Sequence, residues 1–224
     1  MLIPKNILKL GKYATQNDGI YAGSEQAITI RRIGDDKLQA ILSLNGHLVL
    51  GVTWTELPME DFPLLPVTPA NDGVKSGKPI MLQAKVCEQA LKAIGTGRKT
   101  MPILNCLFVE EVERSQNGHQ AGYRCFVTDL EAVSTFVSPI PDEMSPMPEF
   151  FDKQSNGKRA KGSKTNVNIG SVGTIAKMFQ ECLEAGNKVV SMKIQPGAGE
   201  FDPLKLTAEF GGVEAECYLM PMCV

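Results

Sequence analysis

The side chains that most often do chemistry are sparse and poorly grouped in this sequence. There are two histidines, His47 and His119, which are too few for a histidine-based metal centre. Asp129 and Glu131 are two positions apart and would share one face of a strand, although charged residues on a solvent face are the commoner case. The motifs G-x-S-x-G, G-x-x-x-x-G-K-[ST] and H-E-x-x-H are missing, as is a G-x-G-x-x-G that opens a helix. We therefore predict that the protein is not an enzyme and uses no cofactor or metal ion.

The cysteines also give no sign of a reactive centre. Their spacing is wide and none forms a C-x-x-C pair, so neither a zinc site nor a disulfide framework is indicated. We expect reduced thiols that act as small buried hydrophobes. The six positions are Cys87, Cys106, Cys125, Cys182, Cys217 and Cys223.

The overall charge argues against nucleic-acid binding by bulk attraction. The formal net charge is −2 and the pI is about 5.8, whereas a protein that coats DNA by charge alone is basic. Five basic residues and no acidic one fall within 153–164, KQSNGKRAKGSK. The glycine, serine and asparagine there indicate a flexible loop, and both a solvated loop and a phosphate contact remain open.

The sequence shows no targeting or membrane segment. The N-terminal MLIPKNILKL lacks an apolar core followed by a small-residue cleavage site. No apolar run approaches the roughly 20 residues that cross a bilayer. We expect a cytoplasmic protein with no membrane partner.

Apolar periodicity predicts three short helices, each followed by β-strands. Asn45-Gly46 lies between two apolar runs, which is the strongest short-range hairpin signal. The predicted helices cover 4–15, 81–94 and 173–185. The predicted strands cover 27–33, 37–44, 47–54, 102–112, 123–130, 131–137, 188–194, 204–210 and 214–222. Segment 138–165 carries prolines and the basic loop, and we predict that it is irregular.

The order of these elements indicates fold class and domain boundaries. A helix followed by a meander of strands, three times over, favours an α+β fold with antiparallel sheets over a Rossmann-type alternation. Residues 57–79 are rich in proline and glycine, so they form the best boundary in the chain. We predict an N-terminal domain at 1–66, a linker at 67–79 and a C-terminal domain at 80–224.

Several segments, taken in order, resemble a known family. These are LSLNGHLVLGV (42–52), ELPMEDFPLLP (56–66), TMPILNCLFVE (100–110), FVTDLEAVSTF (126–136), PLKLTAEF (203–210) and the terminal YLMPMCV (218–224). They are similar, in this order, to the Gly-His hairpin, the Asp-Phe-Pro segment, the Leu-Pro-Ile-Leu junction, the Thr-Asp-Leu-Glu strand, the strand before the last one and the Met-Pro-Met end of bacterial DNA polymerase III beta sliding clamps. The chain thus resembles a shortened form of this family.

The resemblance implies a DNA-clamp-like α+β fold, in which repeated helix-plus-antiparallel-strands halves pack as a sheet-and-helix domain pair. Residues 1–66 would be a clamp-like half domain and 80–224 a clamp-like domain. The bacterial family has three domains of two halves each, whereas this chain predicts three halves, or four if one lies within 138–165. Leu48 and Cys223 stand where the family has arginines. Two-domain clamps with three chains per ring are an equally open comparison.

The function implied is that of a ring that encircles duplex DNA and tethers a polymerase. Modest positive charge on inward helices would contact phosphates without reading sequence. The candidate DNA-contacting residues on or beside the helices are Lys5, Lys9, Lys12, Lys85, Lys92, Arg98 and Lys177.

The resemblance also implies an apolar pocket for peptides of DNA polymerases and clamp loaders. Its residues would be Gly46, His47, Val49, Pro63, Met220, Pro221 and Met222. An unpaired sheet edge should pair with a neighbouring chain, which predicts a homo-oligomeric ring, with a trimer favoured and a tetramer or dimer possible. The alternative is a clamp-derived module that docks on replication proteins without forming a ring.

Overall fold

Two antiparallel sheets carry the fold. The computed structural model describes residues 1–14, 26–44, 46–58, 78–98, 100–112, 122–140, 147–157, 166–186, 188–199 and 201–221. The four-stranded sheet has the order β1 (Leu2–Pro4), β6 (Cys106–Val112), β7 (Gly122–Thr128), β8 (Val133–Pro139). The seven-stranded sheet has the order β5 (Ile80–Gln83), β2 (Ala27–Arg32), β3 (Lys37–Leu44), β4 (Leu48–Thr55), β11 (Val213–Leu219), β10 (Leu204–Phe210), β9 (Lys193–Gln195). The predicted α+β class with antiparallel sheets is confirmed.

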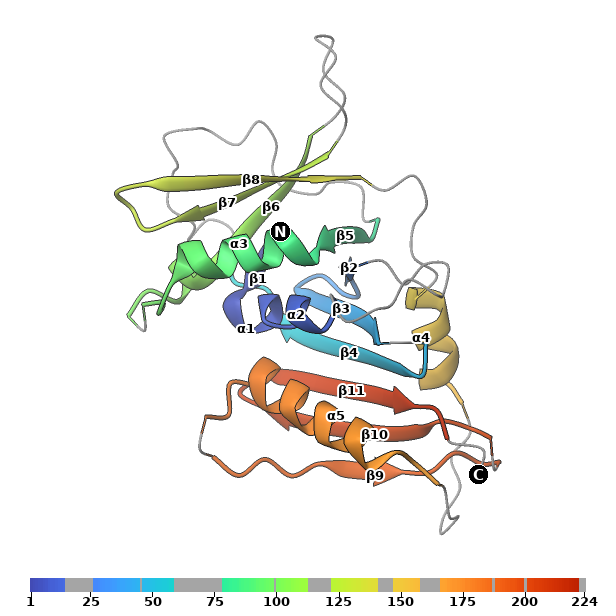
Figure 1. Cartoon of the computed structure of the whole chain (residues 1–224). Helices are drawn as coiled ribbons and strands as arrows, with labels where there is room; N and C mark the ends of the chain where they lie inside the picture. Colours follow the sequence, from blue (N-terminus) through green and yellow to red (C-terminus); the bar gives the residue numbers. More distant parts are fainter. Residues whose placement is uncertain are drawn as a thin grey trace.

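Four helices lie together on one side of these sheets (Figure 1). They are α1 (Lys5–Leu8), α2 (Gly11–Ala14), α3 (Ala84–Ile94) and α5 (Ile169–Cys182). Both α1 and α2 pack against α3, and α1 also contacts α5. In the described ranges, none of the helices is both long and apolar enough to cross a membrane.

The first two helix-plus-strands units exchange their leading strands. Strand β1 precedes α1 in the chain but pairs with β6, with Leu2 opposite Phe108. Strand β5 precedes α3 but pairs with β2, with Leu82 opposite Ile28. Strands from both sides of the predicted 67–79 linker therefore share both sheets. Residues 67–77 lie outside the described part of the chain, and the domain boundary stays a prediction.

The third unit joins the first through the pairing of β4 with β11. This antiparallel ladder runs from Leu48 opposite Leu219 to Thr53 opposite Glu214. On the helical side, Asn6 Nδ2 donates a hydrogen bond of 2.5 Å to the carbonyl of Cys182. One continuous core therefore runs from the first unit into the third.

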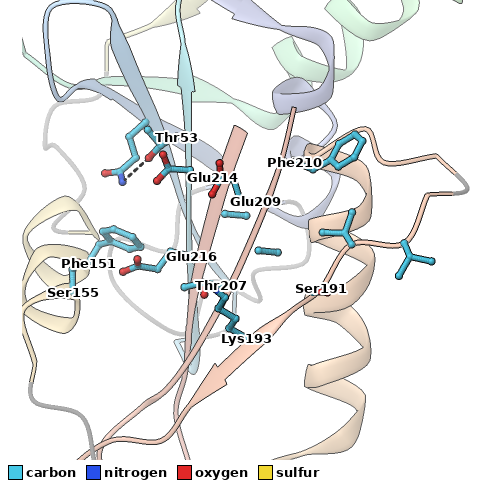
Figure 2. Close-up of a pocket in the computed structure, with 15 residues that line it drawn as sticks. Thr53, Phe151, Ser155, Ser191, Lys193, Thr207, Glu209, Phe210, Glu214 and Glu216 are labelled. Carbon is cyan, nitrogen blue, oxygen red and sulfur yellow. Dashed lines mark hydrogen bonds between the residues drawn. The ribbon is translucent and has the colours of Figure 1, made fainter. Parts of the chain in front are cut away.

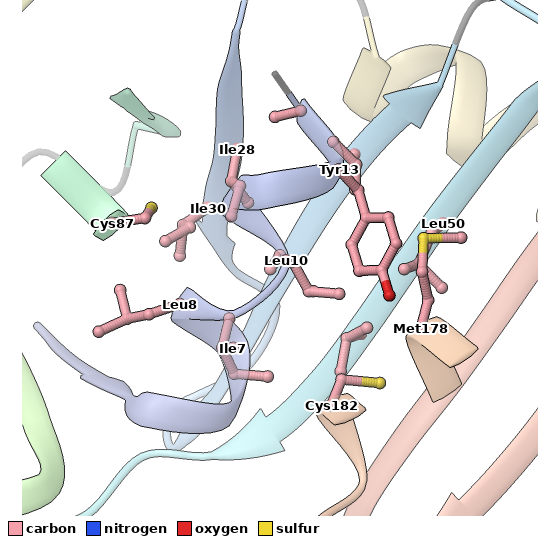
Figure 3. Close-up of a cluster of buried hydrophobic side chains, with 14 of the residues drawn as sticks. Ile7, Leu8, Leu10, Tyr13, Ile28, Ile30, Leu50, Cys87, Met178 and Cys182 are labelled. Carbon is pink, nitrogen blue, oxygen red and sulfur yellow. The ribbon is translucent and has the colours of Figure 1, made fainter. Parts of the chain in front are cut away.

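The core is built where the helices meet both sheets (Figure 3). Alternation along β4 points Leu48 and Leu50 toward the helices, where both are buried. Their neighbours in this core include Ile7, Leu8, Leu10, Tyr13, Ile28, Ile30, Cys87, Met178 and Cys182. Amphipathic helices and strands of period two thus bury a shared apolar layer, which is the main stabilising term of such a fold.

The predicted N-terminal helix forms as two short helices. The prediction of one continuous helix over 4–15 is wrong, because Lys9 and Leu10 form a turn between α1 and α2. Gly11 opens α2 against α3, and a Cβ there would lie 2.6 Å from Cys87 Cβ. The close approach of α2 to α3 therefore determines where the chain turns between α1 and α2.

Two strand predictions need smaller corrections. The predicted strand 102–112 begins with a 3-10 turn, η2 (Pro102–Asn105), before β6. The predicted strand 188–194 is reduced to β9, which spans Lys193–Gln195 at the edge of its sheet. The first change follows from Pro102, which opens the segment 102–112 and favours a 3-10 turn. The second change follows because the segment 188–194 has few packing partners.

Segment 138–165 was predicted to be irregular, and that is wrong for residues 147–155. They form α4 (Met147–Ser155). Pro148 falls in the first turn, where the backbone N–H has no helical partner and proline costs little. Met147, Phe150 and Phe151 recur at helical spacing and pack onto the seven-stranded sheet. Residues 158–165 of the basic loop lie outside the described ranges.

The core predicts a large loss of stability on truncating Leu50. Its side chain is 0% exposed at the centre of the seven-stranded sheet. We expect Leu50→Ala to lower the free energy of unfolding by about 2–5 kcal/mol in urea titrations, because it leaves a cavity. Ile33→Ala, at a side chain 46% exposed, should change it by less than about 0.5 kcal/mol. Equal effects of the two substitutions would contradict this placement of the core.

Candidate partner-docking site and DNA-facing helices

The two faces of the seven-stranded sheet are set by strand alternation. Leu50 points toward the helices, so Val49 and Gly51 point to the opposite face. On the neighbouring strand, Tyr218 pairs with Val49 and Glu216 with Gly51. This opposite face is the one that α4 covers, through contacts with β3 and β4.

The predicted hairpin and the C-terminal strand meet at one end of this ladder. Gly46 has a φ of 69°, the left-handed conformation that a tight turn requires. The N–H of Met220 donates to the carbonyl of His47 at 2.8 Å. Gly46 and His47 are exposed, and Met220 and Pro221 are half-buried. The structure therefore brings together four residues predicted for the pocket, far apart in sequence.

Of the other predicted pocket residues, one is buried and two lie outside the described part of the chain. Val49 is only 3% exposed and packs in a cluster with Ile41, Tyr218 and Phe151. Pro63 and Met222 lie outside the described residues. The cavities of about 610, 720 and 310 Å³ among the described residues are lined by residues other than those predicted for the pocket. A docking pocket at these positions stays a prediction.

Sequence reasoning missed the residues that complete this surface. Ile41, Gly51 and Tyr218 share its face with Val49, and Phe151 lies over it. A signal was present, because the runs 40–42 (AIL) and 48–52 (LVLGV) contain no polar side chain. Continuous apolar runs of this kind indicate strands that are buried on both faces.

A polar groove of about 610 Å³ continues across the same face (Figure 2). Thr53, Glu214 and Glu216 lie along its floor, with Phe151 on one side and Lys193 on the other. Gln39 Nε2 donates to Thr53 Oγ1 at 3.2 Å. The groove thus presents hydrogen-bonding groups beside the apolar cluster, as interfaces for peptides often do.

Tyr218 joins the apolar cluster to the polar groove. Its ring meets that of Phe151 edge-on, with centroids 5.4 Å apart and planes at 75°. Burial raises the pKa of the Tyr218 hydroxyl, and its hydrogen bond to Glu216 raises it further. Glu216 is also paired with Lys205 at 2.8 Å. The tyrosine therefore stays protonated and donates to the carboxylate.

Four of the seven cations predicted to contact DNA already contact oxygen atoms of the protein. Three form ion pairs on the protein: Lys9 with Glu184 at 3.6 Å, Lys12 with Glu181 at 2.6 Å and Lys92 with Glu88 at 2.7 Å. Lys5 donates to the carbonyl of Gly95.

The other three candidate cations are exposed. Lys85 and Lys177 lie on α3 and α5 and form no ion pair with any described acid. Arg98 follows α3 and helps to lower the pKa of Asp129. The helices therefore carry both ion-paired cations and cations without an ion pair. This mixture gives the helical face a modest rather than a strong positive potential.

Lys5, Lys9 and Arg98 border one cavity of about 720 Å³ beside α1 and the end of α3. Trp54 also lines it, and its indole Nε1 is buried without a hydrogen-bond partner in the described structure. An unpaired indole N–H and three cations suit an anionic oxygen acceptor. Glu184 lines the same cavity and offsets part of this charge.

The carboxylates singled out from sequence have a structural role. Asp129 and Glu131 were expected on one strand face, but β7 ends at Thr128 and both lie in the turn before β8. Asp129 Oδ1 accepts from the N–H groups of Glu131 at 3.0 Å and Ala132 at 2.7 Å. These backbone hydrogen bonds hold the pKa of Asp129 below its usual value. The aspartate closes the β7–β8 turn, an Asx-type role.

Among the described residues there is no group of three or more His, Cys, Asp or Glu side chains placed to hold a metal ion. The five described cysteines are all buried and free. Burial raises the pKa of the Cys87, Cys106, Cys125 and Cys182 thiols to about 12. Thiols of this kind are poor nucleophiles at neutral pH.

Comparison with known proteins shows the fold. No protein-family model and no curated protein matches the chain. A DNA polymerase sliding clamp from Bacillus subtilis matches with a TM-score of 0.57 at 8% identity, over 100% of this chain and 64% of that one. A. fulgidus PCNA, solved with the C-terminal region of FEN-1 bound to it, matches with a TM-score of 0.49 at 11% identity, over 100% of this chain and 98% of that one. The chain has the DNA-clamp fold and spans 64% of the length of the Bacillus protein.

The buried thiols predict slow chemical labelling. We expect the folded Cys223→Ser variant, which keeps the five described cysteines, to react with a disulfide reagent at pH 8 more than about 100-fold slower than the same chain in urea. The reason is the small thiolate fraction of groups with a raised pKa, together with blocked access. Rapid labelling of the folded protein would show that at least one of these thiols is reachable.

Proposed function

We propose that this protein is a non-enzymatic DNA sliding clamp, a ring of identical chains that encircles duplex DNA and tethers a polymerase. The observation that carries the proposal is that the candidate DNA-contacting cations and the candidate docking residues lie on different parts of one clamp-fold chain. Helices with exposed cations lie on one side of the sheets, and the meeting point of His47 and Met220 lies at the end of the β4–β11 ladder. The fold likeness supports it over the whole chain.

In this proposal the helical face points toward DNA. Lys85, Arg98 and Lys177 would contact phosphates, and the paired Lys9, Lys12 and Lys92 would exchange protein carboxylates for phosphates. Such contacts carry no sequence information. A net charge of −2 keeps the attraction weak enough for movement along the duplex.

Two sheet edges at opposite ends of the molecule suit ring assembly (Figure 1). Strand β8 exposes Val137 (70%), and the region of β9 exposes Val189 (95%) and Ile194 (52%). We propose that β8 of one copy pairs with β9 of the next, because unpaired apolar edges favour association. Such head-to-tail contacts close into a ring when the rotation per chain divides the circle. A trimer is favoured, and a tetramer or dimer is possible.

The partner side of the ring would hold peptides of DNA polymerases and clamp loaders. The proposed contact residues are Gly46, His47, Val49, Pro63, Met220, Pro221 and Met222. The bond between His47 and Met220 supports this grouping. Methionine suits a surface that serves several partners, because its side chain is flexible and polarizable.

One observation favours the second candidate, a clamp-derived module that docks on replication proteins without forming a ring. Strand β9 has three residues and carries Lys193. Short edge strands that carry lysine are a common device against edge pairing. Assembly state therefore discriminates between the two candidates.

The DNA-facing role predicts weak, salt-sensitive and sequence-independent binding. Replacing both Lys85 and Lys177 by alanine should reduce the slope of log K against log salt by about 2 in titrations with a labelled duplex, because each phosphate contact contributes about 0.9. Lys37→Ala is the control, since Lys37 pairs with Glu214 on the face away from the helices. An unchanged slope in the double variant, or tight sequence-specific binding at high salt, would count against DNA encirclement.

The ring predicts an oligomer whose mass depends on the edge of β8. Light scattering at micromolar concentration should give about three times the chain mass of 24.3 kDa. Val137→Arg should return the mass to that of one chain, because a charge would be buried at the proposed contact. Ile33→Arg, at another exposed apolar side chain, should leave the oligomer intact. A monomeric wild-type protein, with no assembly on DNA, would reject the ring and leave the docking module.

A further inference from the structure

Helix α4 covers one part of the surface to which the proposed function assigns partner peptides, the part around Val49. Val49 belongs to the proposed docking pocket, yet it is 3% exposed because the chain's own Phe151 lies against it. Ile41 and Tyr218 complete the same small cluster, which is separate from the main core. The part of the docking surface around Val49 is therefore already covered by a segment of the protein itself.

The central contact is an aromatic ring in a hollow made by a glycine. A Cβ at Gly51 would overlap the far end of the Phe151 ring, so only glycine at this position of β4 lets the ring approach the strand so closely. Tyr218 closes the hollow, with its ring in an edge-type contact with Phe151 at 5.4 Å between centroids. The hollow is thus shaped for one aromatic side chain, as a hot-spot pocket is.

A charged contact fixes the helix at the rim of the hollow. Asp152, the next residue, accepts two hydrogen bonds from Arg31, at 2.7 Å to Nη1 and 2.5 Å to Nη2. Gln39 Oε1 accepts from Arg31 Nε at 3.0 Å and orients the guanidinium. A bidentate arginine–carboxylate pair gives direction as well as attraction.

Few buried contacts hold α4 in place. Of its nine residues, only Pro148 and Phe151 are buried, and Met147 and Phe150 pack partly buried against the same cluster. An isolated helix of this length is marginal in water, so its structure depends on docking. A helix held by a small apolar cluster around Phe151 and by one exposed ion pair resembles a bound peptide ligand more than a core element.

We propose that α4 is an intramolecular ligand of the partner-docking surface, and that partner peptides must displace it to bind. This inference rests on the proposed function. The partner it fits is a short helical peptide that presents an aromatic side chain followed by a carboxylate, the pair that Phe151 and Asp152 provide. The aromatic ring takes the Gly51 hollow, and the carboxylate takes Arg31.

The test uses a fluorescent peptide with the sequence of residues 147–157 and the full-length chain. Only wild-type molecules in which α4 has left the surface can bind the peptide. The apparent affinity is therefore the intrinsic affinity multiplied by the fraction of molecules with α4 undocked. Phe151→Ala in the chain removes the anchor of the internal helix and leaves the hollow intact. Fluorescence anisotropy should therefore show at least about tenfold tighter binding of the peptide to this variant.

Matched variants separate displacement from a general effect on the protein. Phe201→Ala removes an exposed phenylalanine in the turn before β10 and should leave peptide affinity unchanged. Adding Gly51→Ala to Phe151→Ala should abolish the gain, because the hollow is filled. A peptide that carries alanine in place of its second phenylalanine should not bind the Phe151→Ala chain.

Should Phe151→Ala unfold, Asp152→Ala serves instead, because it removes only the rim contact, at a side chain 51% exposed. It should tighten peptide binding roughly threefold or more, since the internal helix then competes less well. No gain in either variant, or a gain that survives Gly51→Ala, overturns the proposal and makes α4 a fixed part of the fold. Peptide displacement is independent of the oligomer and duplex measurements, so failure of the clamp function and failure of this inference give different results.

Discussion

The pairing of β4 with β11 is the constraint on which the rest of the structure depends. It joins the third helix-plus-strands unit to the first across more than 150 residues of chain, and its register places Leu219 opposite Leu48 and Tyr218 opposite Val49. Because side chains alternate along a strand, this register assigns each residue to a face. A slip of one position would turn the buried leucines to the outer face and Tyr218 into the core.

The β4–β11 pairing gives the two faces of the seven-stranded sheet different contacts. Leu48 and Leu50 bind the helices into a continuous core, and the helices carry the cations that suit phosphate contact. On the other face, Val49 and Gly51 form the surface that receives Phe151. The same ladder ends in the hydrogen bond from Met220 to His47, so the proposed docking surface and the helices proposed to face DNA are held by one set of strand pairings.

The exchange of β1 and β5 gives the first two units a similar dependence on each other. Each unit lends its leading strand to the sheet of the other, and Gly11 lets α2 approach α3 closely. The third unit has no such exchange among the described residues, and it leaves the short β9 at the edge of the sheet. Strand β8 ends the other sheet, and β8 and β9 are the two edges that the proposed ring contact would join.

Local pattern by itself determined the α+β class, the hairpin at Gly46 and most strands, because periodicity and turn chemistry act over a few residues. It also predicted helices at 81–94 and 173–185, which the structure places at 84–94 and 169–182, with residues 81–83 in β5. The motifs also grouped His47 with Met220, whose contact the structure contains. Only the tertiary structure decided the strand exchange, the break after Leu8, the turn at Asp129 and the helix at Met147–Ser155. These depend on contacts between distant segments, such as Phe151 on Gly51 and Arg31 with Asp152, whose energies are invisible to short-range patterns.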